Sequence, residues 1–322
     1  MLIEAPAKVN LTLKVLGRRD DGFHSIETFM QAVTLHDDVS VQWLPEEGGQ
    51  NVECESNSAG GLNIEIHTVI EPGSAADNGN AEAITIDLNN KNNLAYRAAE
   101  LVHSKFKPEL GGRLIIDITK RIPIAAGLAG GSADGAAVLT ALQVLWSVPE
   151  EEVFKLAPEL GSDVAFSFEA QHGLSAAVGG GRGELLTPVA DMDAVFVLYN
   201  PGFGVSTPAV YAEWDKQEKA ALEEELCEGK NVNEDGLSGK ENKRPCFNDL
   251  QQPAISVEPR IAEGLDTLWG LDPTPQHVQL SGSGPTVFAL YPADTDLEKL
   301  KKCLQLQAPR AIIVKPLRNT HL

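Results

Sequence analysis

Residues 120–145 read KRIPIAAGLAGGSADGAAVLTALQVL, and the predicted elements of the chain are arranged around this stretch. The short β-branched run at 114–119 precedes it and predicts a strand. Four glycines between residues 127 and 135 lead into hydrophobic residues at helical spacing, and Pro149 ends the predicted helix. A glycine-rich loop before a helix presents backbone N–H groups and the positive end of the helix dipole to an anion. The stretch therefore predicts either a phosphate-binding loop or a tight turn that packs the helix closely on a sheet.

The loop differs from two common phosphate-binding motifs. A Walker motif ends in Gly-Lys-Ser/Thr, but the Gly-Lys pairs at 229–230 and 239–240 are followed by Asn and Glu. The G-x-G-x-x-G spacing of dinucleotide-binding folds is also missing from this loop. If phosphate binds here, the loop is of a third type.

The composition is that of an ordinary soluble globular protein. The 322 residues suffice for two domains or one large α/β unit, with 43% hydrophobic and 22% charged residues. The net charge of -20 argues against a protein that coats nucleic acid or adheres to an anionic membrane.

The N-terminal sequence, the apolar runs and the cysteines make the cytoplasm the expected location. The N-terminus lacks the layout of a signal peptide, and no apolar run approaches the roughly 18 residues of a membrane helix. The four cysteines, at positions 54, 227, 246 and 303, form no C-x-x-C pair, so neither a zinc site nor a disulfide framework is indicated.

The first half of the chain is rich in strand patterns. Residues 3–16 alternate, with Lys8 and Asn10 on the polar face, where a strand lysine ordinarily faces solvent. Residues 25–44 predict a short helix or strand followed by an alternating strand at 39–43. The polar segment 45–80, with an apolar run near 62–70, predicts an elaborated hairpin, and 84–88 a further strand. A helix then begins with Asn92 or Asn93 as its cap.

The second half mixes helices and strands without strict alternation, which favours an α+β fold. Asp163 stands where an aspartate is commonly a helix N-cap. The glycine turn at 179–184 connects two predicted strands, and 195–199 predicts a buried one. The charged segment 215–244 contains a predicted helix at 219–226 and an exposed excursion. A second glycine loop, 281–285, precedes strand 286–290; a helix at 297–304 and a strand at 311–314 follow.

Several of these segments together resemble the GHMP family of small-molecule kinases. The sequence PIAAGLAGGSA at 123–133 is similar to the phosphate loop of that family. Further segments match in family order, and the similarity is strongest to a branch that phosphorylates a cytidyl diphosphate substrate in the non-mevalonate isoprenoid pathway. These segments are APAKVNL (5–11), GFH (22–24), GSDV (161–164), GRGE (181–184), NDL (248–250) and LSGSGPT (280–286).

The resemblance implies a two-lobed fold. We expect a lobe like domain 2 of ribosomal protein S5 at 1–158, holding ATP, and a ferredoxin-like or split βαβ lobe at 159–322, with a charged insertion near 215–245. It also implies ATP with Mg²⁺ as the cofactor and a small-molecule cytidyl diphosphate substrate, and it leaves the oligomeric state open. No metal ligand is assigned, and Ser132 is expected to bond a phosphate oxygen or lie near the metal.

The resemblance assigns the catalytic roles to Lys8 and Asp163. Asp163 corresponds to the general base that helps to remove the proton of an alcohol, and Lys8 to its cationic partner. The expected ATP-binding residues come from the cap of the first helix and from the glycine loop. They are Asn93, Leu94, Pro123, Ala126, Gly127, Leu128, Ala129, Gly130, Gly131 and Ser132, and the second glycine loop contributes Gly282, Ser283 and Gly284.

The substrate-binding residues follow from the same resemblance. Phe23 and Tyr211 correspond to two aromatic residues that sandwich a cytosine, while Asn10, His24 and Thr207 match or adjoin positions that contact the substrate. Tyr211 has the alternative of a core aromatic on a helix.

Two departures from the family pattern stand out. Ala165 replaces a usual Pro after Asp-Val, and Ala129 replaces a frequent Gly, which the loop tolerates if residue 129 has a negative φ. Three alternatives remain open: another GHMP kinase, of the homoserine or mevalonate type, a non-catalytic protein that binds a nucleotide or sugar, and a decarboxylase of this superfamily.

Overall fold

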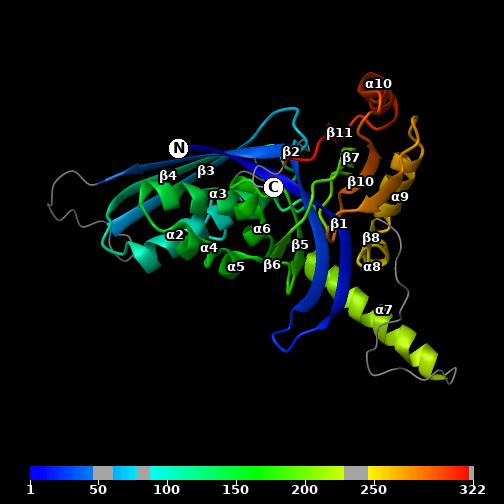
Figure 1. The fold of residues 1–322 in the computed structure, drawn as a ribbon, viewed down its shortest axis with the longest axis horizontal. Coiled ribbons are helices and arrows are strands. Elements are labelled where there is room, and N and C mark those ends of the chain that lie inside the picture. Colours follow the sequence, from blue (N-terminus) through cyan, green and yellow to red (C-terminus); the bar gives the residue numbers. More distant parts are fainter. Residues whose placement is uncertain (46–60, 78–87, 228–245, 319–322) are drawn as a thin grey trace.

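The computed structural model describes residues 1–45, 61–77, 88–227 and 246–318, with the side chains of 222–227 excepted. These residues form two lobes, each built on its own β-sheet (Figure 1). The larger sheet has seven strands in the order β3-β4-β2-β1-β8, and β5 and β6 extend it from β2. Its strands are β1 (Leu2–Arg18), β2 (His24–Leu44), β3 (Leu62–Ile70), β4 (Gly112–Lys120), β5 (Ala176–Gly180), β6 (Leu185–Pro188) and β8 (Phe247–Asn248).

The long antiparallel pair β1–β2 forms the centre of the larger sheet. The alternation of 3–16 is confirmed as a strand, but the expectation that Lys8 faces solvent is wrong, because Lys8 is only 4% exposed. Its face of β1 is covered by the glycine loop, whose Leu128 carbonyl accepts a 3.1 Å hydrogen bond from Lys8 N. Of the short helix or strand predicted before the alternating residues 39–43, the strand is confirmed, and both parts form the single strand β2. The Asp37 carboxylate within it accepts hydrogen bonds from the backbone N–H groups of Arg121 and Ile122.

The hairpin predicted for 45–80 is wrong in its described part. Strand β3 does not pair with β2; it pairs parallel with β4, from Leu62 opposite Gly112 to Ile70 opposite Lys120. Strand β4 lies between β2 and β3 in the sheet, and the connection between the parallel strands β3 and β4 contains the helix at Leu94–Phe106. The strand predicted at 84–88 lies outside the described residues apart from Leu88.

Among the described residues, five helices of the larger lobe pack on one face of its sheet (Figure 1). The cap predicted for the first of them is confirmed, because Asn93 Oδ1 accepts a 2.9 Å hydrogen bond from Ala95 N. The alanine-rich α3 is the most buried, since small side chains let it lie close to the sheet. The five are α2 (Leu94–Phe106), α3 (Gly130–Leu145), α4 (Glu150–Phe154), α5 (Ala157–Leu160) and α6 (Ser162–Gln171).

The smaller lobe has a four-stranded antiparallel sheet in the order β11-β7-β10-β9. One face packs on helices around Val197, Leu280 and Val287. The other face packs through Phe196 and Phe288 on β1 and the glycine loop, so that loop lies between the two sheets. The elements are β7 (Ala194–Tyr199), β9 (His277–Leu280), β10 (Val287–Pro292), β11 (Ala311–Val314), α7 (Thr207–Cys227), α8 (Gln251–Val257), α9 (Arg260–Trp269) and α10 (Leu297–Gln307).

Helix α7 projects from the smaller lobe beside the turn of the β1–β2 hairpin (Figure 1). It begins at Thr207, well before the helix predicted at 219–226. We propose that the lobe boundary lies between Pro188 and Ala194 rather than at 158/159, because α6 packs in the larger lobe and β5 and β6 belong to its sheet.

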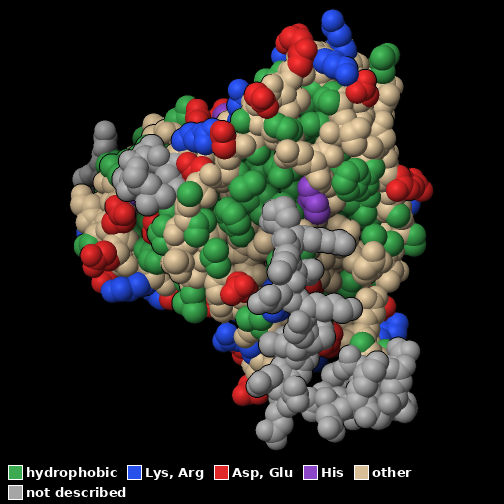
Figure 2. All heavy atoms as spheres, turned by 45° about the vertical axis from the view of Figure 1, so that its right-hand side comes forward, with side chains coloured by type: hydrophobic (Ala, Val, Ile, Leu, Met, Phe, Trp, Pro, Cys, Tyr) green, Lys and Arg blue, Asp and Glu red, His purple; other side chains and the backbone are tan. Residues whose placement is uncertain are grey.

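The surface fits the composition. Acidic and basic side chains are interspersed over the face in Figure 2, and hydrophobic ones gather around a histidine near its middle. Among the described helices, none has the length and apolar character needed to cross a bilayer.

Candidate active site

The glycine loop connects β4 to α3 through three residues in the left-handed region. The φ angles are 51° at Ala125, 76° at Gly127 and 59° at Ala129. The negative φ under which the loop would tolerate Ala129 is therefore not present: this residue is the N-cap of α3, and its left-handed backbone turns the chain into the helix. The turn leaves the first N–H groups of α3, at Gly130 and Gly131, at the positive end of the helix dipole.

The second glycine loop, 281–285, clamps the first one. The Ser281 hydroxyl donates a 3.0 Å hydrogen bond to the Gly127 carbonyl, and Thr286 N donates a 3.2 Å bond to the Ala126 carbonyl. A Cβ on Gly127 would lie 2.3 Å from the Ser281 carbonyl oxygen, so only glycine fits. The role of the second loop that the structure shows is to hold the phosphate-loop candidate in place.

Lys8 lies beneath the glycine loop with its charge directed to the junction of the lobes. Its Nζ donates a 2.6 Å hydrogen bond to Asn10 Oδ1 and a 3.3 Å bond to the Gly127 carbonyl. The same Nζ lies 3.5 Å from Asp163 Oδ2. The structure thus brings together Lys8, Asp163 and the glycine loop, which are far apart in sequence.

Both ends of the Asn10 amide group are hydrogen-bonded in this arrangement. Its Nδ2 donates a 2.8 Å hydrogen bond to Thr28 Oγ1, and the Thr28 hydroxyl donates in turn to the Thr12 carbonyl at 2.7 Å. Because the Asn10 amide group is fixed by Thr28, its oxygen must point at the Lys8 ammonium. Its predicted contact with substrate stays a prediction.

Asp163 is the second residue of α6, so the N-cap interpretation is wrong. The N-cap is Gly161, and no side chain caps the helix. The carboxylate instead stands in the first turn, at the positive end of the helix dipole, and 36% of its side chain is exposed. It is therefore the member of the Lys8–Asp163 pair that a ligand can reach.

The N-terminus of α2 lies against α3. Asn93 uses both ends of its amide group, since Nδ2 donates to the Leu88 carbonyl at 2.9 Å while Oδ1 caps the helix. Leu94 packs on α3 so closely that a Cβ on Gly135 would lie 3.2 Å from Leu94 Cβ. The predicted ATP contacts of Asn93 and Leu94 remain predictions.

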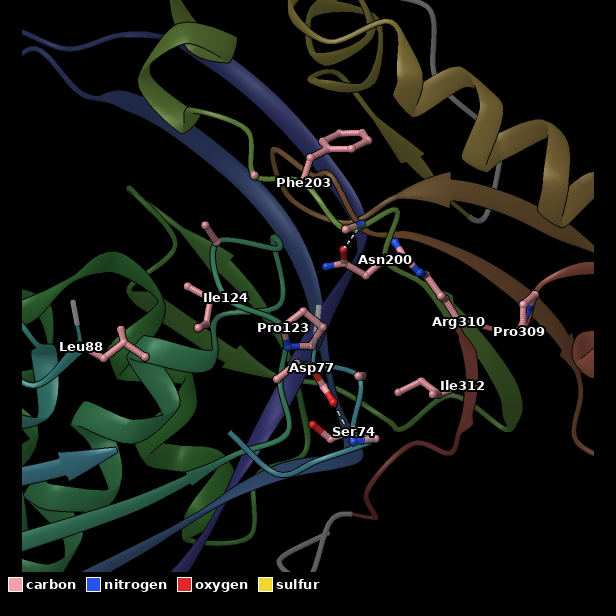
Figure 3. A pocket seen from close by; sticks show the side chains of 16 residues that line it. Ser74, Asp77, Leu88, Pro123, Ile124, Asn200, Phe203, Pro309, Arg310 and Ile312 are labelled. Atoms are coloured by element: carbon pink, nitrogen blue, oxygen red, sulfur yellow. Dashed lines mark hydrogen bonds between the residues drawn. The ribbon is translucent and has the colours of Figure 1, made fainter. Parts of the chain in front are cut away.

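A cavity of about 910 Å³ opens beside the glycine loop, between the two lobes (Figure 3). Its walls include Pro123 and Ile124 of the loop and, from the smaller lobe, Phe203 and Arg310. Leu88, next to the α2 cap, lines it too. Of the predicted loop residues, Pro123 alone lines this cavity.

A cluster of aromatic rings lies where α7 meets the β1–β2 turn. The rings of His24 and Tyr211 are stacked, with centroids 4.7 Å apart and an interplanar angle of 23°. Burial, together with the charge of Asp163, holds the pKa of Tyr211 well above its usual range. The charge of the candidate base therefore acts on this ring cluster.

Phe23 stands apart from this cluster. It is 54% exposed, and the Arg182 guanidinium lies 5.0 Å from its ring centroid. The predicted pairing of Phe23 with Tyr211 around a base stays a prediction. Thr207, the first residue of α7, contacts the second glycine loop instead. Its hydroxyl lies 2.7 Å from the Ser283 hydroxyl, and this hydrogen bond joins the start of α7 to that loop.

Comparison with known proteins agrees with this geometry. Residues 93–171 match the family model "GHMP kinases N terminal domain". A 4-diphosphocytidyl-2-C-methyl-D-erythritol kinase of Acaryochloris marina is 34% identical over 95% of this chain and 92% of its own length. The chain belongs to this family of GHMP kinases.

Other members of the family are similarly close. The kinase of the same name from Listeria innocua is 30% identical over 98% of this chain and 95% of its own length. A crystal structure of 4-(cytidine 5'-diphospho)-2C-methyl-D-erythritol kinase covers 98% of the chain and 99% of that chain, with a TM-score of 0.66 and 30% identity. A mevalonate kinase structure, with a TM-score of 0.56 and 13% identity over 99% of this chain and 100% of its own, shares the fold alone. The α+β, two-lobed GHMP kinase fold expected from the sequence is confirmed.

In this GHMP kinase, one buried charge cluster next to the loop escaped the sequence analysis. Lys120 Nζ lies 2.5 Å from Asp37 Oδ2 and 2.6 Å from Asp134 Oδ2, and the three side chains are at most 4% exposed. Burial, partly offset by the Lys120 ammonium, raises the pKa of Asp134 to about 7. Lys120 and Asp134 both lie within the stretch quoted from the sequence. Charged residues near a loop ordinarily face solvent, so the sequence pattern did not indicate this cluster.

Proposed function

We propose that this protein transfers the terminal phosphoryl group of ATP to the 2-hydroxyl group of 4-diphosphocytidyl-2-C-methyl-D-erythritol. The observation that carries the proposal is the 3.5 Å approach of Lys8 Nζ to the exposed carboxylate of Asp163, directly below the glycine loop. Membership of a kinase family with that substrate in its name supports the choice of acceptor.

The Lys8–Asp163 pair activates the acceptor alcohol. An alcohol is a weak nucleophile at neutral pH, so a carboxylate within hydrogen-bond reach of the hydroxyl removes its proton as attack proceeds. Asp163 is accessible enough for this role. Lys8, held by Asn10 and the Gly127 carbonyl, stabilises the carboxylate and the negative charge that develops on the attacking oxygen.

The donor is held by the loop and by α3. Exposed Gly131 and half-buried Ser132, in the first turn of α3, present N–H groups at the positive end of the helix dipole to the phosphates. The cavity lined by Leu88 and Pro123 adjoins this loop and supports placing the nucleoside end of ATP there. Phosphoryl transfer then depends on alignment and charge neutralisation rather than on further covalent chemistry.

Magnesium, which ATP-dependent kinases use, fits this site with few protein ligands. Among the described residues no three His, Cys, Asp or Glu side chains cluster as a metal site. Mg²⁺ in kinases is commonly held by substrate phosphates, water and one or two side-chain oxygens. The Ser132 hydroxyl, in the first turn of α3, would be a candidate ligand, and the ion would neutralise the charge of the phosphates.

A coupled assay of ADP release tests the proposal. We expect turnover with ATP, Mg²⁺ and 4-diphosphocytidyl-2-C-methyl-D-erythritol, and phosphorus NMR of the product should show a new monoester at the 2-position. Homoserine and mevalonate serve as control acceptors and should release no ADP above the acceptor-free rate. Turnover of either control instead would assign the chain another substrate, and ligand binding without any ADP release would make it a binding protein.

A further inference from the structure

The aromatic cluster contains a carboxylate that the proposed chemistry does not use. Asp215 Oδ1 lies 2.7 Å from His24 Nε2, in the interior of the contact between α7 and the β1–β2 turn. The His24 side chain is only 7% exposed, whereas that of Asp215 is 31% exposed. The pair therefore joins two elements that are distant in sequence.

Three residues of α7 surround the His24 imidazole. Tyr211 stacks on its face, and the Trp214 ring approaches at 83° with its centroid 5.6 Å away. Tyr211, Trp214 and Asp215 are spaced i, i+3 and i+4, so they share one face of the helix. The ring is thus held by stacking on Tyr211, an edge contact with Trp214 and the hydrogen bond to Asp215.

The hydrogen bond also determines which nitrogen carries the hydrogen. An ionised carboxylate only accepts hydrogen bonds, so Nε2 must donate to Asp215. In the neutral ring, Nδ1 then presents a lone pair. No described residue is bonded to Nδ1, so this lone pair is available to a ligand.

We propose that Asp215 is a positioning residue that makes the His24 site selective for an amino-pyrimidine. The proposal rests on the proposed function, whose cytidyl substrate carries a cytosine ring, and the rings of Tyr211 and Trp214 beside His24 offer such a flat base a stacking surface. The 4-amino group of cytosine can donate to the Nδ1 lone pair, whereas the 4-oxo group of uracil would oppose it with a second lone pair. Asp215 acts through His24 and has no contact with the reacting phosphate.

A purely structural role for Asp215 is the competing explanation. Its Oδ2 lies 3.7 Å from Arg18 Nη1, so the carboxylate could serve only to fasten α7 to the hairpin. Arg18 is 65% exposed, however, and an exposed ion pair at this distance stabilises little. Arg18→Gln therefore separates the two contacts of Asp215.

The experiment compares the cytidyl substrate with its uridyl analogue in steady-state assays. For Asp215→Leu we expect KM of the cytidyl substrate to rise about tenfold, with kcat changed less than about twofold. The preference for the cytidyl over the uridyl substrate should fall about tenfold. The amide of Asp215→Asn can either accept or donate a hydrogen bond, so KM and the cytidyl preference of this variant should lie between those of the parent and Asp215→Leu. This variant also covers the case that Asp215→Leu does not fold. Arg18→Gln and Glu213→Gln, the latter on the same helix, should behave like the parent.

A double mutant completes the test. In a His24→Gln background, Asp215→Leu should change neither KM nor the preference further, because its effect passes through His24. Equal rises of KM for both substrates, or additive effects in the double mutant, would overturn the inference. Failure of the parent protein to use the cytidyl substrate would instead overturn the proposed function, so the two failures are distinguishable.

Discussion

Lys8 Nζ lies 3.5 Å from Asp163 Oδ2, but its shortest contact is the 2.6 Å hydrogen bond to Asn10. The ammonium is therefore held in place by Asn10 and by the Gly127 carbonyl, and its position does not depend on Asp163. The carboxylate is left partly exposed and can bond to a ligand hydroxyl while the ammonium stays close by. This division between a fixed cation and an accessible base leads to the first prediction.

Asp163→Asn should lower kcat by about 10² to 10⁴-fold, because an amide cannot take the proton of the alcohol. Lys8→Met should have an effect of similar size, and the double variant should be little worse than either single one, since the two residues act as a unit. Steady-state ADP release measures all three, and thermal unfolding provides the control for folding. Near-parent rates in Asp163→Asn would remove this residue from the mechanism.

Substitution by alanine should change the unfolding free energy differently at Gly127 and at Gly131. At Gly127 the new Cβ would lie 2.3 Å from the Ser281 carbonyl and the φ of 76° is unfavourable for alanine, so Gly127→Ala should lower the unfolding free energy by about 2 kcal/mol or more. At Gly131 the nearest atom is 4.0 Å away, so Gly131→Ala should leave stability nearly unchanged.

The Gly131 variant also tests the site of the donor phosphates. A Cβ at this exposed position would stand where we place the phosphates, so KM for ATP should rise about tenfold without loss of stability. Urea denaturation and ATP titrations measure the two quantities separately. An unchanged KM for ATP would mean that the phosphates do not approach the first turn of α3.

Ala129 is strained, and glycine should relieve the strain. Its φ of 59° costs an alanine about 1 kcal/mol more than a glycine, so Ala129→Gly should raise the unfolding free energy by about that amount. The matched control is Ala133→Gly in the helical part of α3, which should lower it by about 1 kcal/mol or more. Destabilisation by both variants would contradict the left-handed backbone at residue 129.

Local patterns predicted the elements whose signals are contained within a few residues. The loop and helix at 123–145, the Asn93 cap and the strand at 195–199 all depend on neighbours in sequence, and the structure confirms them. Lys8 shows the limit of such patterns. Alternation placed it on the polar face of a strand, and it gave no sign that the glycine loop would cover that face.

Contacts between distant elements could not be predicted from the sequence. The parallel pairing of β3 with β4 depends on how the chain crosses the sheet, and the Asp215–His24 bond depends on the path of α7 past the hairpin. The Lys8–Asp163 pair was expected only because the sequence resembles a known family. Physical periodicity alone does not bring these two residues together.

The unfolding free energy of the protein should decline in alkaline solution, because two buried groups stay protonated in the folded state at pH values where they ionise in the unfolded chain. Burial raises the pKa of Cys246 to about 11 and that of Tyr291 to about 12. The unfolded chain ionises at lower pH than the folded one, so between about pH 9 and pH 11 the folded state binds more protons. The unfolding free energy should then fall as pH rises, by up to about 1.4 kcal/mol per pH unit for each group.

Cys246→Ala should make this decline shallower from about pH 9, and Tyr291→Phe only from about pH 10. Urea denaturation followed by circular dichroism at a series of pH values measures the slopes, and a parent-like slope in Cys246→Ala would show that this thiol is not protected from ionisation by the fold.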